Sequence, residues 1–324
     1  MKSFESFLAP QLSEFLLYRE NLGYATDPVR TYLKAFDRYL KTHKPDQALL
    51  TPSFFLELRA QLNLESRSVN RILSSLRRFF RYLVRRGLYT ENPVQDIPPL
   101  PENALVPFVF SSAETTMLLE AVSKRVRKSP EYFLIDLALY VAIVLLAQCG
   151  MRIKEPLRLV RSQYRSRERT LYIEKTKFKK DRLIPIPKAA AVEIDNYLAV
   201  RSAVLWDDRN PYLLAGKERK ALRDDCVRSL FHQAVKAIGL QRPRQIIGTT
   251  TFSAPTPHSL RHSFAVNTLK RVKERGGSAQ NALPVLATYM GHSEYKHTVK
   301  YLAVLDAKHR QGLLDVSLSL QEKR

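Results

Sequence analysis

Length, composition and charge narrow the class of protein. The 324 residues, 45% of them hydrophobic, suffice for two domains that each bury a core. The net charge of +22 predicts a polyanionic partner, with nucleic acid favoured over an anionic membrane surface. The first residues carry no long apolar segment, the longest apolar run (Leu137 to Cys149) is too short to span a bilayer, and only two cysteines are present. We therefore expect a cytoplasmic protein with no disulfide framework and no thiolate zinc site.

Residues 1–95 predict a helical domain. Apolar residues recur at three- and four-residue spacing from Phe4 to about Leu88. The clearest helix runs from Ser68 to Gly87, a glycine suited to end it. One side of this helix is apolar and the other carries arginines, which either bind phosphates or form an ordinary solvated surface. The candidates for DNA contact are Arg71, Arg77, Arg78, Arg81 and Arg85.

A proline-rich, polar segment from Asp96 to Asn103 interrupts the helical pattern. We assign residues 96–106 to an interdomain linker and residues 107–324 to a second domain with a C-terminal tail. Residues 1–106 contain 15 basic and 11 acidic side chains, so the second domain carries most of the net charge.

The second domain is predicted to mix helices with a small β-structure. Two β-rich runs flank a lysine-rich turn between Thr170 and Pro187, which is typical of a hairpin. The stretch that follows Gly239 and runs through Thr251 is expected to be a loop. Helical patterns cover Ser112–Lys124, Tyr132–Cys149, Ala189–Ser202 and Asp224–Gly239.

The segment Thr256-Pro257-His258 predicts the start of a further helix, with threonine as N-cap and proline at the first helical position. His258 and Arg261 then share one face at a helix N-terminus, which favours phosphate binding. Alternatively, His258 and His262 are metal ligands or surface groups, but a serine stands where a zinc protease needs glutamate. We expect a structural hydrogen-bonding role for His262.

Arg152 follows the apolar run. Gly150 can end that helix and Pro156 can begin the next, which leaves Arg152 in a turn. An Arg-x-x-Glu pair such as Arg152 and Glu155 carries little information alone, and its value here comes from its place in the chain.

One set of residues, taken in chain order, resembles the catalytic set of the tyrosine recombinase (phage integrase) family. The set is Arg152, His258, Arg261, His292 in Gly291-His292-Ser293, and Tyr301. The resemblance implies a mainly α fold with a small β-sheet, made of a helical N-terminal core-binding domain and an α+β catalytic domain. It also implies a lysine at a hairpin tip, for which Lys177 is the candidate. Lys175, Lys179 and Lys180 are rivals, and Lys175 and Lys179 are also candidates for DNA contact.

The family chemistry needs neither metal nor nucleotide cofactor. By resemblance, the arginines and imidazoles stabilise the charged transition state while Tyr301 attacks phosphorus to form a 3′-phosphotyrosyl link. Lys177 would protonate the departing 5′ oxygen, and His258 would accept or return the phenol proton. The expected partner is double-stranded DNA, held by a homotetramer on two recombination sites that passes through a Holliday junction.

Two other functions remain open. A type IB topoisomerase or a telomere resolvase would share the chemistry, and a non-catalytic DNA-binding relative would share only the fold. All six residues that the family chemistry requires are present, which argues against a non-catalytic relative. An N-terminal domain of recombinase size ahead of a short linker favours a recombinase over the other two enzymes.

Two segments lie outside the motifs. Val316 to Leu320 alternates apolar and polar residues, which predicts a short strand. The resemblance to tyrosine recombinases implies that the chain beyond the tyrosine docks on a neighbouring subunit, for which strand addition to a sheet edge is the expected mode. Lys270 to Pro284 is expected to be a long, flexible connection between the two histidine motifs.

Overall fold

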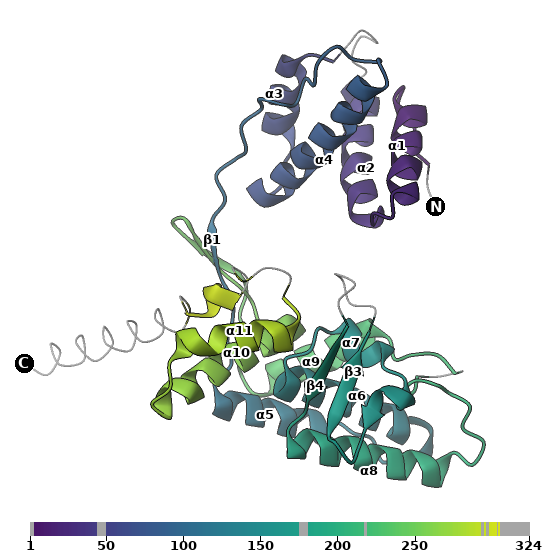
Figure 1. Cartoon of the computed structure of the whole chain (residues 1–324), viewed down its shortest axis with the longest axis vertical. Helices are drawn as coiled ribbons and strands as arrows, with labels where there is room; N and C mark the ends of the chain where they lie inside the picture. The colour runs from purple at the N-terminus through teal and green to yellow at the C-terminus, as the bar shows by residue number, and fades with distance from the viewer. Residues whose placement is uncertain are drawn as a thin grey trace, which may run out of the picture. The chain divides into compact units, whose positions relative to one another are not determined.

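The computed structural model places two compact units, Met1–Asn103 and Ala104–Arg324 (Figure 1). Each is described by itself. The structure describes residues 3–43, 50–174, 181–216, 219–292, 295, 298–302 and 304.

The first unit consists of four helices around one core. They are α1 (Ala9–Asn21), α2 (Asp27–His43), α3 (Pro52–Gln61) and α4 (Ser66–Arg85). The strongly amphipathic α4 packs its apolar side against α1 and α2, where Phe79 contacts Phe15 with ring centroids 5.5 Å apart. The helical interpretation of this region is confirmed, and Gly87 (φ +72°) follows the end of α4 in the left-handed conformation expected of it.

The predicted linker is divided between the two units. Ile97 is 4% exposed in the core of the first unit. At the other end, Ala104–Val106 forms strand β1 of the second unit. The proline-rich sequence therefore excludes helix, as predicted, but several of its residues pack against one unit or the other.

The core of the second unit surrounds α6 (Pro130–Cys149). Around it pack α5 (Ser112–Ser123), α8 (Lys188–Val204), α9 (Asp224–Ala237) and α10 (Pro257–Glu274). The helix is 20 residues long, longer than its apolar run indicated, and apolar enough by composition to cross a membrane. Its side chains from Ala138 to Cys149 are instead mostly buried against these neighbours, which is the environment of a core helix.

An antiparallel sheet packs beside these helices. Its strands, in spatial order, are β2 (Tyr164–Arg165), β3 (Thr170–Ile173) and β4 (Arg182–Pro185), and a short 3-10 helix (Arg161–Gln163) precedes them. Leu171 is paired with Ile184, and both are buried. The predicted hairpin is confirmed. Its lysine-rich tip, residues 175–180, lies outside the described residues, and so do Lys175, Lys177, Lys179 and Lys180.

A second small sheet was not expected. Strand β6 (Thr250–Phe252) pairs in parallel with β1 and antiparallel with β5 (Gln245–Ile247). The loop predicted after Gly239 and through Thr251 is therefore wrong where these two strands lie. A run of threonines suits a strand, but its partner β1 lies far upstream, so no local pattern could show the pairing.

The connection between the two histidine motifs is short. Helix α10 continues to Glu274, and α11 (Ala279–Met290) begins after four residues, with the Ser278 side chain accepting from the Asn281 N–H. The predicted long, flexible connection is wrong, because two helices take up most of it. The two helices pack against each other and, with the short α7 (Lys154–Arg158), position the site described next.

Candidate active site

The site is built at the first turn of α10. Thr256 is the N-cap and Pro257 the first helical residue, as predicted, and the Thr256 N–H donates to Ser259 Oγ at 3.1 Å. This turn brings His258, Arg261 and His262 toward the ends of α6 and α11.

Arg261 ties three helices together. Its side chain is 1% exposed, and it donates from Nη1 to the Gly150 carbonyl at 2.6 Å and from Nη2 to the Met290 carbonyl at 2.5 Å. Both acceptors are at helix C-termini, where carbonyls lack helical partners and the dipole is negative. Burial and then the charge of Arg152 lower the pKa of Arg261 to about 10, so it is still a cation at neutral pH.

Arg152 lies in the turn between α6 and α7, as predicted. Gly150 ends α6 in the left-handed conformation (φ +58°). The Arg152 guanidinium donates to Glu155 Oε1 at 2.9 Å and to the Gly291 carbonyl at 2.8 Å, and the Arg152 N–H donates to Glu155 Oε2. Glu155 therefore holds both the guanidinium and the backbone of Arg152.

Arg182, which no sequence motif singled out, is the second cation on Glu155. Its two Nη atoms donate to the carboxylate at 3.1 and 2.9 Å, and its Nε donates to the Tyr289 carbonyl at 2.9 Å. Burial opposes ionisation of Glu155, but the hydrogen bonds and charge of Arg182 outweigh it and hold the pKa below its usual value. Alternation along β4 places Arg182 on the same inward face as Ile184, but its contact with Glu155 joins segments far apart in the sequence.

Gly291 makes room for this arrangement. Its φ of +62° is in the left-handed region, and a Cβ there would come within 3.0 Å of Arg182 Nη1. A side chain at this position would disturb both the end of α11 and the buried guanidinium.

Tyr301 lies on a helical segment, residues 298–302, and is 4% exposed. Its hydroxyl is 3.3 Å from His262 Nδ1. Burial raises the pKa of the phenol, and the charges of Arg261 and Arg152 offset part of that increase. Burial, with His258, Arg261 and His292 nearby, lowers the pKa of His262 to about 3, so this imidazole is neutral at pH 7.

The other two imidazoles differ in their partners. His292 forms a hydrogen bond between Nδ1 and Thr298 Oγ1 at 2.7 Å, and its ring stacks on Tyr301 with centroids 6.1 Å apart. His258 is exposed, and no side chain or backbone group in the described part of the chain forms a hydrogen bond with it. Packing around its ring, with Arg261 and Arg152, lowers the pKa of His258 to about 4.

Five of the six predicted catalytic residues thus gather where α6 and α11 end and α10 begins: Arg152, His258, Arg261, His292 and Tyr301. The sixth, Lys177, is outside the described residues. Across the part of the chain that the structure describes, no three His, Cys, Asp or Glu side chains are placed to hold a metal ion. The contacts available are those of guanidinium, imidazole and phenol, which suit a phosphodiester.

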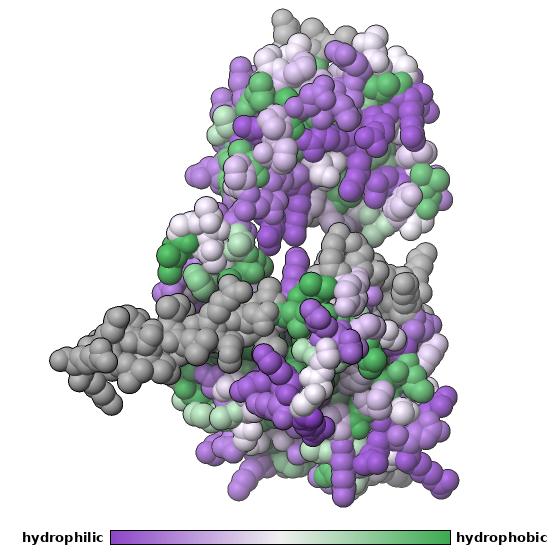
Figure 2. All heavy atoms as spheres, turned by 60° about the vertical axis from the view of Figure 1, so that its left-hand side comes forward, coloured by the Kyte–Doolittle hydropathy of each residue, from purple (hydrophilic) through white to green (hydrophobic). Residues whose placement is uncertain are grey.

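The predicted arginine surface on α4 is only partly available to DNA. Arg71, Arg78, Arg81 and Arg85 are exposed, and Figure 2 shows a largely hydrophilic surface on the first unit. A cavity of about 480 Å³ is lined by Arg78, Arg81 and Arg85 together with Tyr18 and Tyr24. Arg77 must be reassigned, because its guanidinium donates to the Val94 and Ile97 carbonyls and so holds the chain after α4.

Similar proteins cover nearly all of this chain. The model of the phage integrase family matches residues 113–308, and the model of the phage integrase N-terminal SAM-like domain matches residues 15–87. A Sinorhizobium fredii protein with the provisional name integrase/recombinase y4rE is 30% identical over 93% of both chains. The tyrosine recombinase XerD of Pseudomonas putida is 28% identical over 87% of both chains.

Solved structures share the fold. A XerH recombinase in a post-cleavage complex with a palindromic difH substrate has a TM-score of 0.67 at 17% identity, covering 94% of this chain and 83% of XerH. A lambda integrase dimer bound to a COC′ core site has a TM-score of 0.65 at 18% identity, covering 91% of this chain and 76% of the integrase.

The fold and the family matches define a tyrosine recombinase, an enzyme that cleaves and joins DNA strands. The chain belongs to the phage integrase family.

Proposed function

We propose that this enzyme is a site-specific recombinase that cleaves and rejoins DNA through a 3′-phosphotyrosyl intermediate. The observation that carries the proposal is the convergence of Arg152 and Arg261 on the ends of α6 and α11, beside Tyr301. Two cations held by buried carbonyls and a carboxylate are preorganised to bind the non-bridging oxygens of a phosphate.

The chemistry divides among the site residues. The Tyr301 oxygen attacks phosphorus, and the bond from phosphorus to the 5′ oxygen breaks. Arg152, Arg261, His258 and His292 stabilise the charge on the phosphoryl oxygens, and Lys177 gives a proton to the 5′ oxygen. A 5′ hydroxyl from the other duplex then attacks the phosphotyrosine and releases Tyr301, so the bond energy is retained and no cofactor is consumed.

The buried phenol adds a step before cleavage. A phosphodiester of a DNA duplex cannot reach an oxygen on a side chain that is 4% exposed. DNA binding therefore has to expose the Tyr301 hydroxyl, and with it the Arg261 guanidinium, which is 1% exposed. Because its nucleophile is shielded in the resting arrangement, the enzyme does not cleave DNA on which it is not correctly assembled.

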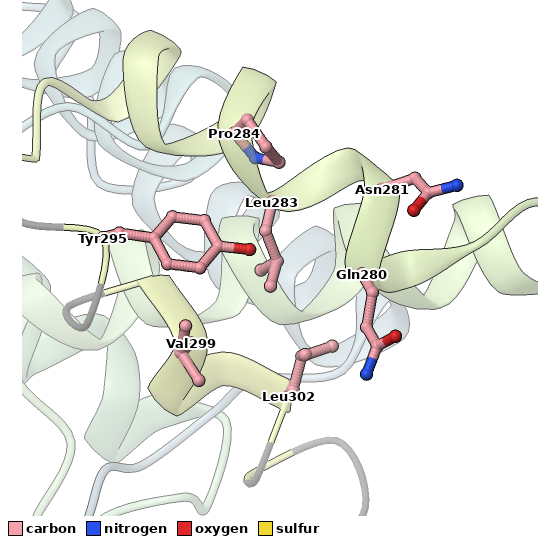
Figure 3. A pocket seen from close by; sticks show the side chains of 7 residues that line it. All are labelled: Gln280, Asn281, Leu283, Pro284, Tyr295, Val299 and Leu302. Atoms are coloured by element: carbon pink, nitrogen blue, oxygen red, sulfur yellow. The ribbon is translucent and has the colours of Figure 1, made fainter.

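The partner is double-stranded DNA, and the active assembly is a homotetramer on two sites in the cytoplasm, independent of membranes. A lambda integrase tetramer has been crystallised on a Holliday junction. Between α11 and the segment that carries Tyr301 lies a groove of about 630 Å³, lined by apolar side chains that Figure 3 shows facing it, among them Leu283, Val299 and Leu302. The predicted trans segment, Val316 to Leu320, is outside the described residues. We propose that its apolar side chains dock in this groove on a neighbouring subunit. Helical residues line most of the groove, so this docking differs from the addition of a strand to a sheet edge.

The test begins by trapping the protein on DNA and sequencing the DNA covalently attached to it. A plasmid carrying two copies of the recovered sequence is then incubated with the enzyme. Deletion or inversion products support a recombinase. Relaxed plasmid without recombinants would indicate a topoisomerase, and hairpin-ended products a telomere resolvase, while failure to trap any DNA would indicate a non-catalytic relative.

A further inference from the structure

The contact of His262 with Tyr301 leads to an assignment for the phenol proton. The proposed chemistry requires the Tyr301 hydroxyl to lose its proton as the oxygen attacks phosphorus, and a base has to lie within hydrogen-bond reach of that oxygen. His262 Nδ1 is 3.3 Å from it. His258, the acceptor expected from the sequence, is exposed and forms no hydrogen bond with Tyr301 in the described structure.

Relying on the proposed function, we propose that His262 is a further catalytic residue, which orients the Tyr301 hydroxyl through Nδ1 and accepts its proton during attack. The proton moves from the phenol oxygen to Nδ1 as the bond to phosphorus forms and the bond to the 5′ oxygen breaks. In the reverse step, His262 returns the proton to the phenol oxygen that leaves phosphorus. The 5′ oxygen takes its proton from a separate acid. One proton is therefore removed from the nucleophile and one is given to the leaving group, and the proton transfers balance.

The surroundings of His262 suit this role. Accepting the proton requires a free Nδ1 lone pair, so the ring has to be neutral and carry its resting proton on Nε2. The charged and titratable groups that face it are His258 and Arg261 on α10, His292 beyond α11, and Tyr301. None of them is an anion at neutral pH, and burial also disfavours the imidazolium, so the ring is neutral before the reaction. The anionic phosphodiester that Tyr301 attacks would bring a negative charge close to this ring and favour the imidazolium as the proton is taken.

The positions of the two histidines on α10 divide the work. They are one helical turn apart, with ring centroids 4.6 Å apart and nearly perpendicular rings. His258, on the exposed side, is free to donate to a phosphoryl oxygen. His262, one turn deeper, faces the nucleophile. The same helix therefore serves both the phosphate and the phenol.

The decisive variant is His262→Asn, because asparagine can place an amide oxygen close to the position of Nδ1 but cannot take the proton. Single-turnover cleavage is measured from pH 6.5 to 8.5 on a nicked duplex carrying the sequence recovered from the trapped adduct. We expect DNA binding to persist and the cleavage rate at pH 7 to fall by about 100-fold or more. We also expect a steep pH dependence, close to tenfold per unit, because only preformed phenolate then reacts, whereas the wild-type rate stays nearly flat.

Controls separate a base from a structural group. His232→Asn, on the exposed face of α9, should match the wild type. His258→Asn should be slower with a flat pH profile. If His262→Asn melts early, His262→Ala with added imidazole replaces it, and partial recovery of cleavage is expected. A flat profile in His262→Asn, or a steep one in His258→Asn, would overturn the assignment.

The proposed function has a separate test. If Tyr301→Phe abolishes the covalent adduct while His262→Asn keeps the wild-type rate, only the role of His262 fails. If the adduct survives Tyr301→Phe, the proposed function fails at its nucleophile.

Discussion

Replacing Glu155 by glutamine removes the carboxylate that Arg152 and Arg182 share. The Glu155 and Arg182 side chains are 9% and 8% exposed, so water cannot fully replace the lost carboxylate as the partner of the Arg182 guanidinium. Breaking such a buried pair costs about 3–5 kcal/mol. For a unit of this size each kcal/mol lowers Tm by about 2–4 °C, so the transition of the second unit should move down by roughly 6–20 °C.

Differential scanning calorimetry measures this shift, and the chain offers a matched control. Glu168 pairs with Arg165 on the surface, where both side chains are more than half exposed, so Glu168→Gln should cost less than about 1 kcal/mol. Because the folded pKa of Glu155 is depressed, its contribution is present above the usual carboxyl pKa and lost as the pH falls through the folded value. The gap between wild type and Glu155→Gln should narrow in acid. Equal melting of the two variants at pH 7 would refute the reasoning.

Three further changes test the leaving-group acid, the arginine surface and the tail. Lys177→Ala should cleave ordinary DNA slowly but be rescued by a 5′-bridging phosphorothiolate, whose sulfur leaves without a proton. Equal defects on both substrates would assign Lys177 to binding. Lys175→Ala is the comparison. DNA affinity is measured by fluorescence anisotropy at several salt concentrations. Arg81→Ala should lower the slope of log affinity against log salt concentration by about one phosphate contact, whereas Arg77→Ala should lower Tm and leave this slope unchanged. Equal slopes for the two variants would exclude a phosphate contact by Arg81. Truncation after Leu314 should preserve single-site binding and impair assembly on two sites in gel-shift assays, and normal recombination would show that the tail has no role.

Local signals predicted much of the fold. Threonine and proline before His258 indicated the start of α10, Gly150 indicated the end of α6, and alternation around the lysine turn indicated the hairpin, because each depends on neighbouring residues alone. The pairing of β1 with β6 depends on segments far apart in sequence. So does the choice of helix over loop after Lys270, where packing of α10 on α11 decides.

The same distinction applies to the site. Motif order was sufficient to select Arg152, His258, Arg261, His292 and Tyr301, which the structure places near one another. The supporting contacts were not predictable, because they join β4 to α7 and α10 to the segment of residues 298–302. Arg182 therefore looked like one more basic residue after a lysine turn, and His262 looked like a structural group.

The central claim is that Tyr301 is the nucleophile. The most direct measurement is the covalent protein–DNA adduct that survives denaturing electrophoresis, compared between wild type and Tyr301→Phe. Tyr295→Phe is the control, since Tyr295 lies six residues earlier in the chain and is half exposed. We predict that Tyr301→Phe binds DNA normally and forms no adduct, while Tyr295→Phe forms it as the wild type does. An adduct of wild-type yield in Tyr301→Phe would contradict the claim.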